Sequence, residues 1–191
     1  MPPSLRCFLA IRVPAHRQLV GLIRALDHLG RSVRGVNPDG IHVTLKFLGT
    51  TPVEHVAAII DRLRVPLAAR IRHQATIRGV GVFPSIQRPR VVWAGIEPSV
   101  LLTDIARVCE AVCQPLGYPA ESRAFQPHAT LARIHGRPPD SLASILAEQA
   151  DALFGPLPIE SVELMRSNPG SDTNRYTTIA AIPLGGTETK S

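Results

Sequence analysis

The segment His42-Val43-Thr44-Leu45-Lys46-Phe47-Leu48-Gly49 carries a four-residue word that returns as His128-Ala129-Thr130-Leu131. Both copies lie in apolar surroundings typical of a β-strand, at residues 40–49 and 125–133. Alternate residues of a strand share a face, so each copy predicts an imidazole beside a hydroxyl, with apolar side chains on the other face. Chance would give two such words in on the order of one in two thousand similar chains. The repeat therefore predicts two halves of one active site.

The pattern strand-helix-strand-helix-strand occurs twice along the chain, and the two words hold equivalent places in it. Strands are predicted near residues 6–13, 40–49, 75–82, 90–96, 125–133, 159–167 and 175–183, and helices at 14–29, 51–67, 98–116 and 140–153. We therefore predict an α+β fold of two pseudo-symmetric lobes. Each lobe would hold an antiparallel-type sheet with helices on the outside, and the active-site cleft would lie between them. Residues 1–184 are expected to form this single bilobal domain and residues 185–191 a flexible tail.

The composition of the 191 residues is that of a soluble globular protein, with 45% hydrophobic and 19% charged residues. No apolar run approaches the roughly 18 residues of a membrane helix, and the N-terminus does not resemble a signal peptide. Three cysteines without metal-binding spacing suit a reducing compartment, so a cytoplasmic location is expected. The formal net charge of +6 favours an anionic partner.

The paired words fit the needs of a phosphodiesterase that works without a metal ion. One neutral imidazole serves as a base and one protonated imidazole as an acid, because histidine titrates near neutral pH. Thr44 and Thr130 supply hydroxyl donors for the phosphoryl oxygens. Sequence motifs of zinc hydrolases, P-loop enzymes and dinucleotide-binding enzymes do not occur. We therefore expect no metal and no cofactor.

With these words in place, the chain resembles the 2H phosphoesterases, and within them the RNA 2′,3′-cyclic phosphodiesterases once described as 2′-5′ RNA ligases. The resemblance is carried by residues 6–14, 42–49, 125–133 and 162–167, and by Tyr176. It implies the bilobal fold and the opening of an RNA 2′,3′-cyclic phosphate to a 2′-phosphate. By the same resemblance His42 is the general acid on the leaving 3′ oxygen, His128 the general base on water, and Arg133 a phosphate ligand. RNA with a cyclic phosphate end is the expected partner, and a monomer is the expected state.

Four further residues are predicted to bind substrate. Strict pleating would place Arg133 on the opposite face from His128, so either a bulge or the end of the strand must turn it toward the phosphate. Lys46 shares the His42 face by strand parity, although a solvated strand residue explains it equally well. Phe8 and Arg12 share a face of the first strand, where Phe8 would stack on a base and Arg12 would lie near the RNA backbone. A core aromatic is the alternative for Phe8.

Two other functions remain open at this point. A 2′-5′ RNA ligase, or a phosphodiesterase acting on 2′-5′ linked oligonucleotides, would use the same residues. A non-catalytic RNA-binding module would use the same basic cleft without needing two His-x-Thr words. Replacement of both histidines separates these classes, because a binding module would keep its RNA affinity and lose no turnover.

Overall fold

The structure is a computed structural model that describes residues 3–168 and 175–186. Within these residues lie nine β-strands, four α-helices and two short 3-10 helices. The strands are β1 (Ser4–Arg12), β2 (Val33–Gly35), β3 (His42–Pro52), β4 (His73–Phe83), β5 (Val91–Glu97), β6 (His128–Ile134), β7 (Leu153–Ile159), β8 (Ser161–Asn168) and β9 (Arg175–Pro183). The α-helices are α1 (Arg17–Asp27), α2 (Val53–Ala68), α3 (Val100–Cys113) and α4 (Ser141–Glu148), and the 3-10 helices are Pro38–Gly40 and Gln114–Leu116.

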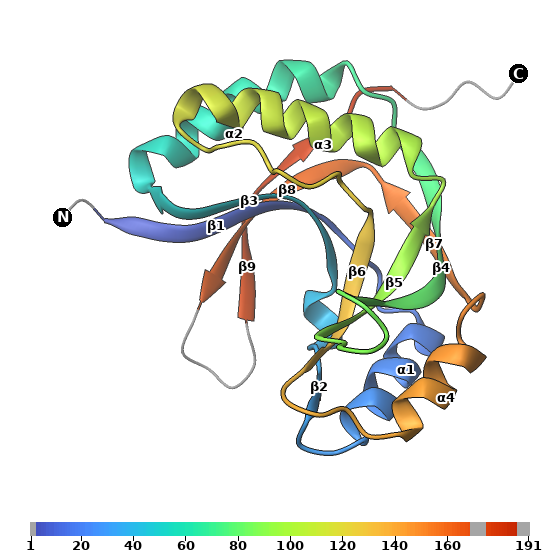
Figure 1. The fold of residues 1–191 in the computed structure, drawn as a ribbon. Helices are drawn as coiled ribbons and strands as arrows, with labels where there is room; N and C mark the ends of the chain where they lie inside the picture. Colours follow the sequence, from blue (N-terminus) through green and yellow to red (C-terminus); the bar gives the residue numbers. More distant parts are fainter. Residues whose placement is uncertain (1–2, 169–174, 187–191) are drawn as a thin grey trace, which may run out of the picture.

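The nine strands form one antiparallel sheet with the order β7-β4-β5-β6-β3-β1-β8-β9, and β2 pairs with β6 beside this path. The sheet is strongly curled, with α2 and α3 at one end and α1 and α4 at the other (Figure 1). The predicted α+β class is confirmed. The two predicted sheets are the two halves of one sheet, which we call the β3 half (β3, β1, β8, β9) and the β6 half (β6, β5, β4, β7).

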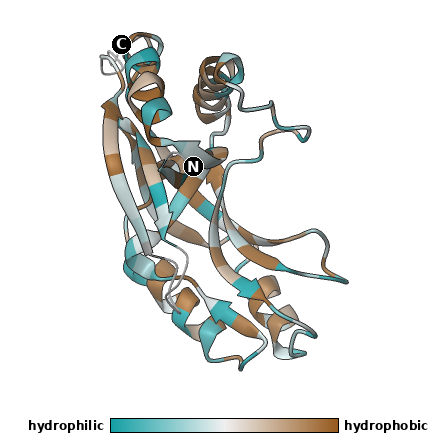
Figure 2. Ribbon diagram, turned by 90° about the vertical axis from the view of Figure 1, so that its left-hand side faces the viewer, coloured by the Kyte–Doolittle hydropathy of each residue, from teal (hydrophilic) through white to brown (hydrophobic). Residues whose placement is uncertain are grey.

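Two helices connect the halves, because each follows a strand of one half in the chain and packs on the other half. Helix α1 follows β1 in the chain, yet it packs on β2, β6 and β7. Helix α3 follows β5, yet it packs on α2 and β3. Hydrophobic residues alternate with hydrophilic ones along the strands (Figure 2), and most buried side chains of both halves form one continuous core. Phe8, Ala10 and Met165 form a separate small cluster. Each fully buried aliphatic side chain contributes about 1.5–3 kcal/mol, so the shared core holds the halves together.

The sequence prediction missed two strands. Strand β2 has only three residues, too few to show a period. For strand β7, the sequence predicts a helix up to about Leu153 and the next strand only from about residue 159, whereas helix α4 ends at Glu148. Pro156 and Pro158 lie within β7 and are unusual in strands because they cannot donate to a ladder. The structure resolves this, since β7 is an edge strand of the sheet and pairs only with β4 among the described strands.

The first residues of the predicted tail are anchored to the domain. The backbone N–H of Gly185 donates to the carbonyl of Arg70, at 2.8 Å, and the N–H of Arg72 donates to the carbonyl of Gly186, also at 2.8 Å. Residues 187–191 of the predicted tail lie outside the described residues. Among the helices of the described chain, none combines the length and the apolar character needed to span a membrane.

A β-bulge follows the second His-x-Thr word. Thr130 and Ala132 of β6 pair with two consecutive residues of β5, so Leu131 between them has no partner in β5. Leu131 and Ala132 are both buried, and Arg133 is exposed. Because the bulge shifts the pleat by one residue, Arg133 returns to the face of His128. Of the two predicted alternatives, the structure therefore has the bulge.

The same bulge follows the first word. Thr44 and Lys46 of β3 pair with two consecutive residues of β1, so Leu45 between them has no partner in β1. The burial pattern of the first seven residues is identical in β3 and β6. Phe47 consequently occupies the position that Arg133 has in the second copy, five residues after the histidine.

The bulge corrects the prediction for Lys46. Strand parity placed this residue on the face of His42, but after the bulge its side chain is 1% exposed and turned toward α3. Its ammonium group forms an ion pair with Glu110, at 3.0 Å, and donates to the carbonyl of Pro119. Lys46 therefore fixes the segment that precedes β6 to the β3 half of the sheet.

Replacement of Lys46 by Met should lower the free energy of unfolding by about 2–3 kcal/mol, because Glu110 and the Pro119 carbonyl lose a buried cation. Urea denaturation followed by circular dichroism measures this change. The matched control is Arg62→Met on exposed helix surface, with an expected change within about 0.5 kcal/mol. Unchanged stability combined with a raised KM would instead show that Lys46 binds substrate.

Candidate active site

A cavity of about 1750 Å³ opens over the strands that carry the two His-x-Thr words. His42 and Thr44 of β3 line it together with His128 and Thr130 of β6. All four side chains are half-buried, whereas the residues between them, Val43 and Ala129, are fully buried in the core. The structure thus brings the two predicted half-sites into one cavity.

The register between β3 and β6 explains how the half-sites meet. The two strands pair at a single position, where Val43 is opposite Ala129. In an antiparallel pair this register sets His42 opposite Thr130 and Thr44 opposite His128. Each histidine therefore faces the threonine of the other copy across the strand pair. The site has a local pseudo-twofold axis through the Val43–Ala129 pair.

Both imidazoles are oriented by the same backbone contact. Nδ1 of His42 lies 2.7 Å from the carbonyl oxygen of Gly40, and Nδ1 of His128 lies 2.7 Å from that of Gln126. A carbonyl only accepts hydrogen bonds, so Nδ1 carries the proton in both rings. Nε2 is then the atom that gains or loses a proton. This arrangement suits both a general base and a general acid.

Aromatic rings enclose each histidine. The ring centroids of Phe8 and Tyr176 are each 4.8 Å from that of His42. Around His128, the centroid of Phe83 lies at 4.9 Å and that of Trp93 at 6.4 Å. These contacts fix the ring planes and remove water from one side of each imidazole.

Burial and charge lower the pKa of both histidines. For His42 the largest cause is burial, and the positive charges of Arg133, Arg12 and His128 lower the pKa further, against the hydrogen bond to Gly40. For His128 burial lowers the pKa against the hydrogen bond to Gln126. A low dielectric disfavours the imidazolium, so both rings are mostly neutral at pH 7.

The structure places two predicted substrate contacts against other side chains. Phe8 lines the cavity but is 3% exposed, and it packs on His42 and Tyr176 in a small cluster apart from the main core, so it supports the His42 ring and offers little surface to a base. Arg12 does not line the cavity. Its guanidinium pairs with Glu163, at 3.3 Å, and donates to Thr178, at 2.9 Å. The charge of Arg12 still reaches His42, as its effect on the pKa of that ring indicates.

Sequence reasoning missed several cavity residues. Phe47 is 64% exposed and is the most exposed of the aromatic side chains that line the cavity, so it is available for stacking. Regular strand alternation would place Phe47 on the face opposite His42, and the bulge at Leu45 reverses this alternation. Five arginines besides Arg133 also line the cavity: Arg6, Arg34, Arg90, Arg107 and Arg123. Their separation along the chain gives no local motif.

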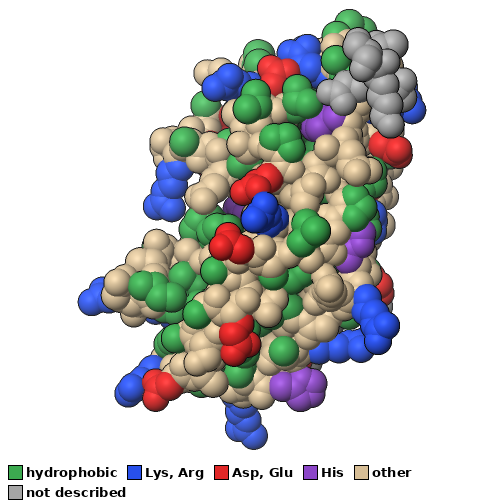
Figure 3. Space-filling model, turned by 90° about the vertical axis from the view of Figure 1, so that its right-hand side faces the viewer, with side chains coloured by type: hydrophobic (Ala, Val, Ile, Leu, Met, Phe, Trp, Pro, Cys, Tyr) green, Lys and Arg blue, Asp and Glu red, His purple; other side chains and the backbone are tan. Residues whose placement is uncertain are grey.

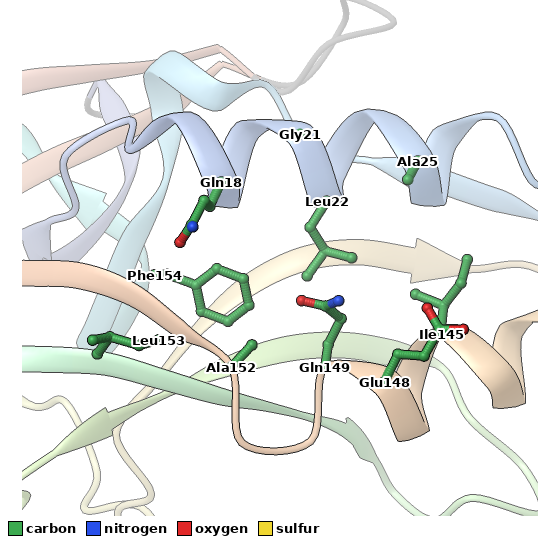
Figure 4. A pocket seen from close by; sticks show the side chains of 10 residues that line it. All are labelled: Gln18, Gly21, Leu22, Ala25, Ile145, Glu148, Gln149, Ala152, Leu153 and Phe154. Carbon is green, nitrogen blue, oxygen red and sulfur yellow. The ribbon is translucent and has the colours of Figure 1, made fainter.

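A second hollow of about 530 Å³ lies between α1 and the segment of α4 and β7 (Figure 4). Gln18, Leu22, Gln149 and Phe154 line it, and Glu148 is the only ionisable residue in its lining. It therefore offers no acid-base pair.

The molecular face in Figure 3 intermingles acidic and basic side chains and shows no single-sign patch. Within the described ranges, no group of three or more His, Cys, Asp or Glu side chains is arranged to hold a metal ion.

Known proteins resemble this chain over most of its length. The family described as LigT like Phosphoesterase matches residues 11–93 and 96–175, with one His-x-Thr word in each segment. The RNA 2′,3′-cyclic phosphodiesterase of Aeropyrum pernix is 34% identical over 152 residues, covering 78% of this chain and 85% of that protein. The protein of the same name from Methanothermobacter thermautotrophicus is 32% identical over 167 residues, covering 86% and 90%.

Solved structures match over nearly the whole chain. The protein TT0787 of Thermus thermophilus is 28% identical, with a TM-score of 0.78 and coverage of 95% of this chain and 99% of that one. Escherichia coli LigT complexed with 3′-AMP is 23% identical, with a TM-score of 0.73 and the same coverage. The second likeness concerns the fold alone.

Removal of the Arg133 charge should raise the pKa of His42 and leave that of His128 unchanged, because Arg133 lowers only the former. NMR titration of the imidazole resonances in Arg133→Gln measures both values. Arg6→Gln is the matched control, since Arg6 lines the same cavity and is not among the charges that lower the pKa of His42. Equal shifts of both histidines in Arg133→Gln would contradict this electrostatic assignment.

Proposed function

The chain belongs to the LigT-like phosphoesterases, and from this premise we propose that it hydrolyses RNA 2′,3′-cyclic phosphate ends to 2′-phosphates. One observation carries the proposal: two imidazoles with protonated Nδ1 share a cavity, and each lies opposite the other copy's threonine. In-line displacement at phosphorus needs a base and an acid on opposite sides. The pseudo-twofold arrangement supplies both.

In the proposed reaction His128 acts on water and His42 on the leaving oxygen. Nε2 of His128 takes a proton from water as the water oxygen bonds to phosphorus. The bond from phosphorus to the 3′ oxygen breaks, and Nε2–H of His42 donates its proton to that oxygen. The products are a 2′-phosphomonoester and a free 3′-hydroxyl. Both histidines return to their starting states by exchanging one proton with solvent.

The threonines and Arg133 stabilise the charge that develops on the phosphoryl oxygens. Thr44 and Thr130 both line the cavity, from the neighbouring strands β3 and β6, and each would donate its hydroxyl to a phosphoryl oxygen. Removing one such donor typically costs about 10²–10³ in rate. Arg133 adds a permanent positive charge, and its planar guanidinium suits two phosphoryl oxygens at once.

Substrate binding helps to protonate the proposed acid. Arg133 lowers the pKa of His42 in the free protein, where the positive charge has no bound anion. A phosphodiester anion at Arg133 offsets this charge and attracts the imidazolium, so the pKa of His42 rises on binding. This supports the assignment of His42 as the residue that carries the proton in the complex.

The test is incubation of the protein, in EDTA and without ATP, with a short RNA that ends in a 2′,3′-cyclic phosphate. The expected product is an RNA with a 2′-phosphate end. His42→Ala and His128→Ala should each reduce kcat by about 10³-fold or more, because each removes one proton transfer. His28→Ala, at an exposed helix end, is the matched control with wild-type turnover. A near-wild-type rate in either active-site variant would exclude the paired-histidine mechanism.

The pH dependence should differ between kcat/KM and kcat. Burial lowers the pKa of both histidines in the free protein, so the bell-shaped profile of kcat/KM should lie on the acid side of the ordinary histidine range and fall as pH rises further. In the complex the pKa of His42 is raised, so the alkaline limb of kcat should lie at higher pH. Initial rates from about pH 4.5 to 8.5 give both profiles. Coincident alkaline limbs would rule out proton uptake coupled to substrate binding.

A further inference from the structure

We propose that Arg34 and Arg90, beside Arg133, form a subsite for the phosphodiester on the 5′ side of the terminal nucleotide. The substrate class is then an oligoribonucleotide with at least one internal phosphate, in preference to a nucleoside 2′,3′-cyclic monophosphate. The inference rests on the proposed function and deepens it, because it assigns a direction to the RNA in the cavity.

Strand pairing sets Arg34 beside Arg133, and Arg90 precedes the residue that pairs with Arg133 on the other side of β6. Arg34 of β2 is the direct antiparallel partner of Arg133 of β6. On the other side of β6, Arg133 pairs with Val91, the residue after Arg90, and the N–H of Ile134 donates to the carbonyl of Arg90 at 2.8 Å. All three side chains are exposed and line the cavity.

The three charges lack an acidic partner in the described parts of the chain, where the ion pairs involve other cations. Like charges placed directly opposite on paired strands destabilise a sheet. Arg34 and Arg133 have this arrangement, and Arg90 adds a third charge beside them. Such a concentration of unneutralised guanidinium groups in a cavity favours an anionic ligand, and the planar fork of arginine suits phosphate.

The register also sets the side of the reaction on which this cluster lies. Because His42 is opposite Thr130, the later residues of β6 extend past His42 and away from His128. His42 is the proposed acid, so the leaving 3′ oxygen and its ribose lie on its side of the phosphorus. The chain leading 5′ from that ribose then runs toward Arg133, Arg34 and Arg90.

The experiment compares two substrates, adenosine 2′,3′-cyclic monophosphate and the dinucleotide ApA with a 2′,3′-cyclic phosphate end. In the wild type, kcat/KM should be at least tenfold higher for the dinucleotide. In Arg34→Gln and in Arg90→Gln the ratio of the two kcat/KM values should fall about tenfold. Arg62→Gln, an equal loss of charge on the exposed surface of α2, should keep the wild-type ratio.

A dinucleotide whose internal linkage is a neutral methylphosphonate separates charge recognition from base contacts. The wild type should process it about as slowly as Arg34→Gln processes ApA, and the variant should show no further loss. Turnover of both natural substrates with equal kcat/KM, and a ratio insensitive to Arg34→Gln, would overturn the subsite and leave the proposed function intact. Absence of turnover with either substrate would overturn the proposed function and the subsite with it.

Discussion

The pairing of Val43 with Ala129 is the constraint on which the rest of the molecule depends. It is the one registered pair between β3 and β6, two strands that the structure describes in full, and it joins two halves of a sheet that otherwise diverge. A slip of one residue would reverse the faces of a strand and send one imidazole into the core. A single pair is too weak to prevent such a slip. The crossing of α1 and α3 onto opposite halves supplies the missing stability through a continuous core.

The two copies of the half-site are alike up to the bulge and differ after it. The histidine, the threonine and the extra leucine are common to both, and they keep the acid-base pair symmetric. Five residues after the histidine, one copy has exposed Phe47 and the other has Arg133. An apolar ring and a guanidinium prefer different parts of a nucleotide. A symmetric catalytic centre thus acquires two unlike ends, as binding to an RNA chain with a direction requires.

The sequence predicted the features that depend on short-range periodicity. The α+β class and the four helices follow from patterns of two and 3.6 residues. The shared site of His42 and His128 was predicted from the repeated His-x-Thr-Leu word. For Arg133 the sequence predicted either a bulge or the end of the strand, and the structure has the bulge. No bulge was predicted before Lys46, and the one present there turns its side chain toward α3. Arg12 and Phe8 lie on the expected strand face, but Arg12 forms an ion pair with Glu163 and Phe8 packs against Tyr176. Such partners come from distant parts of the chain and have no local signal.

Arginine in this cavity acts on the histidines as well as on the substrate. The charge of Arg133 makes protonation of the His42 imidazole costly, so His42 stays neutral when no anion is bound. The same charge repels other cations from the site. A phosphodiester reverses both effects, since it neutralises Arg133 and favours the imidazolium at the same time. The protonated acid is therefore most populated when an anion is bound. A basic cavity that would by itself disfavour a histidine acid becomes suited to one through the charge of the substrate.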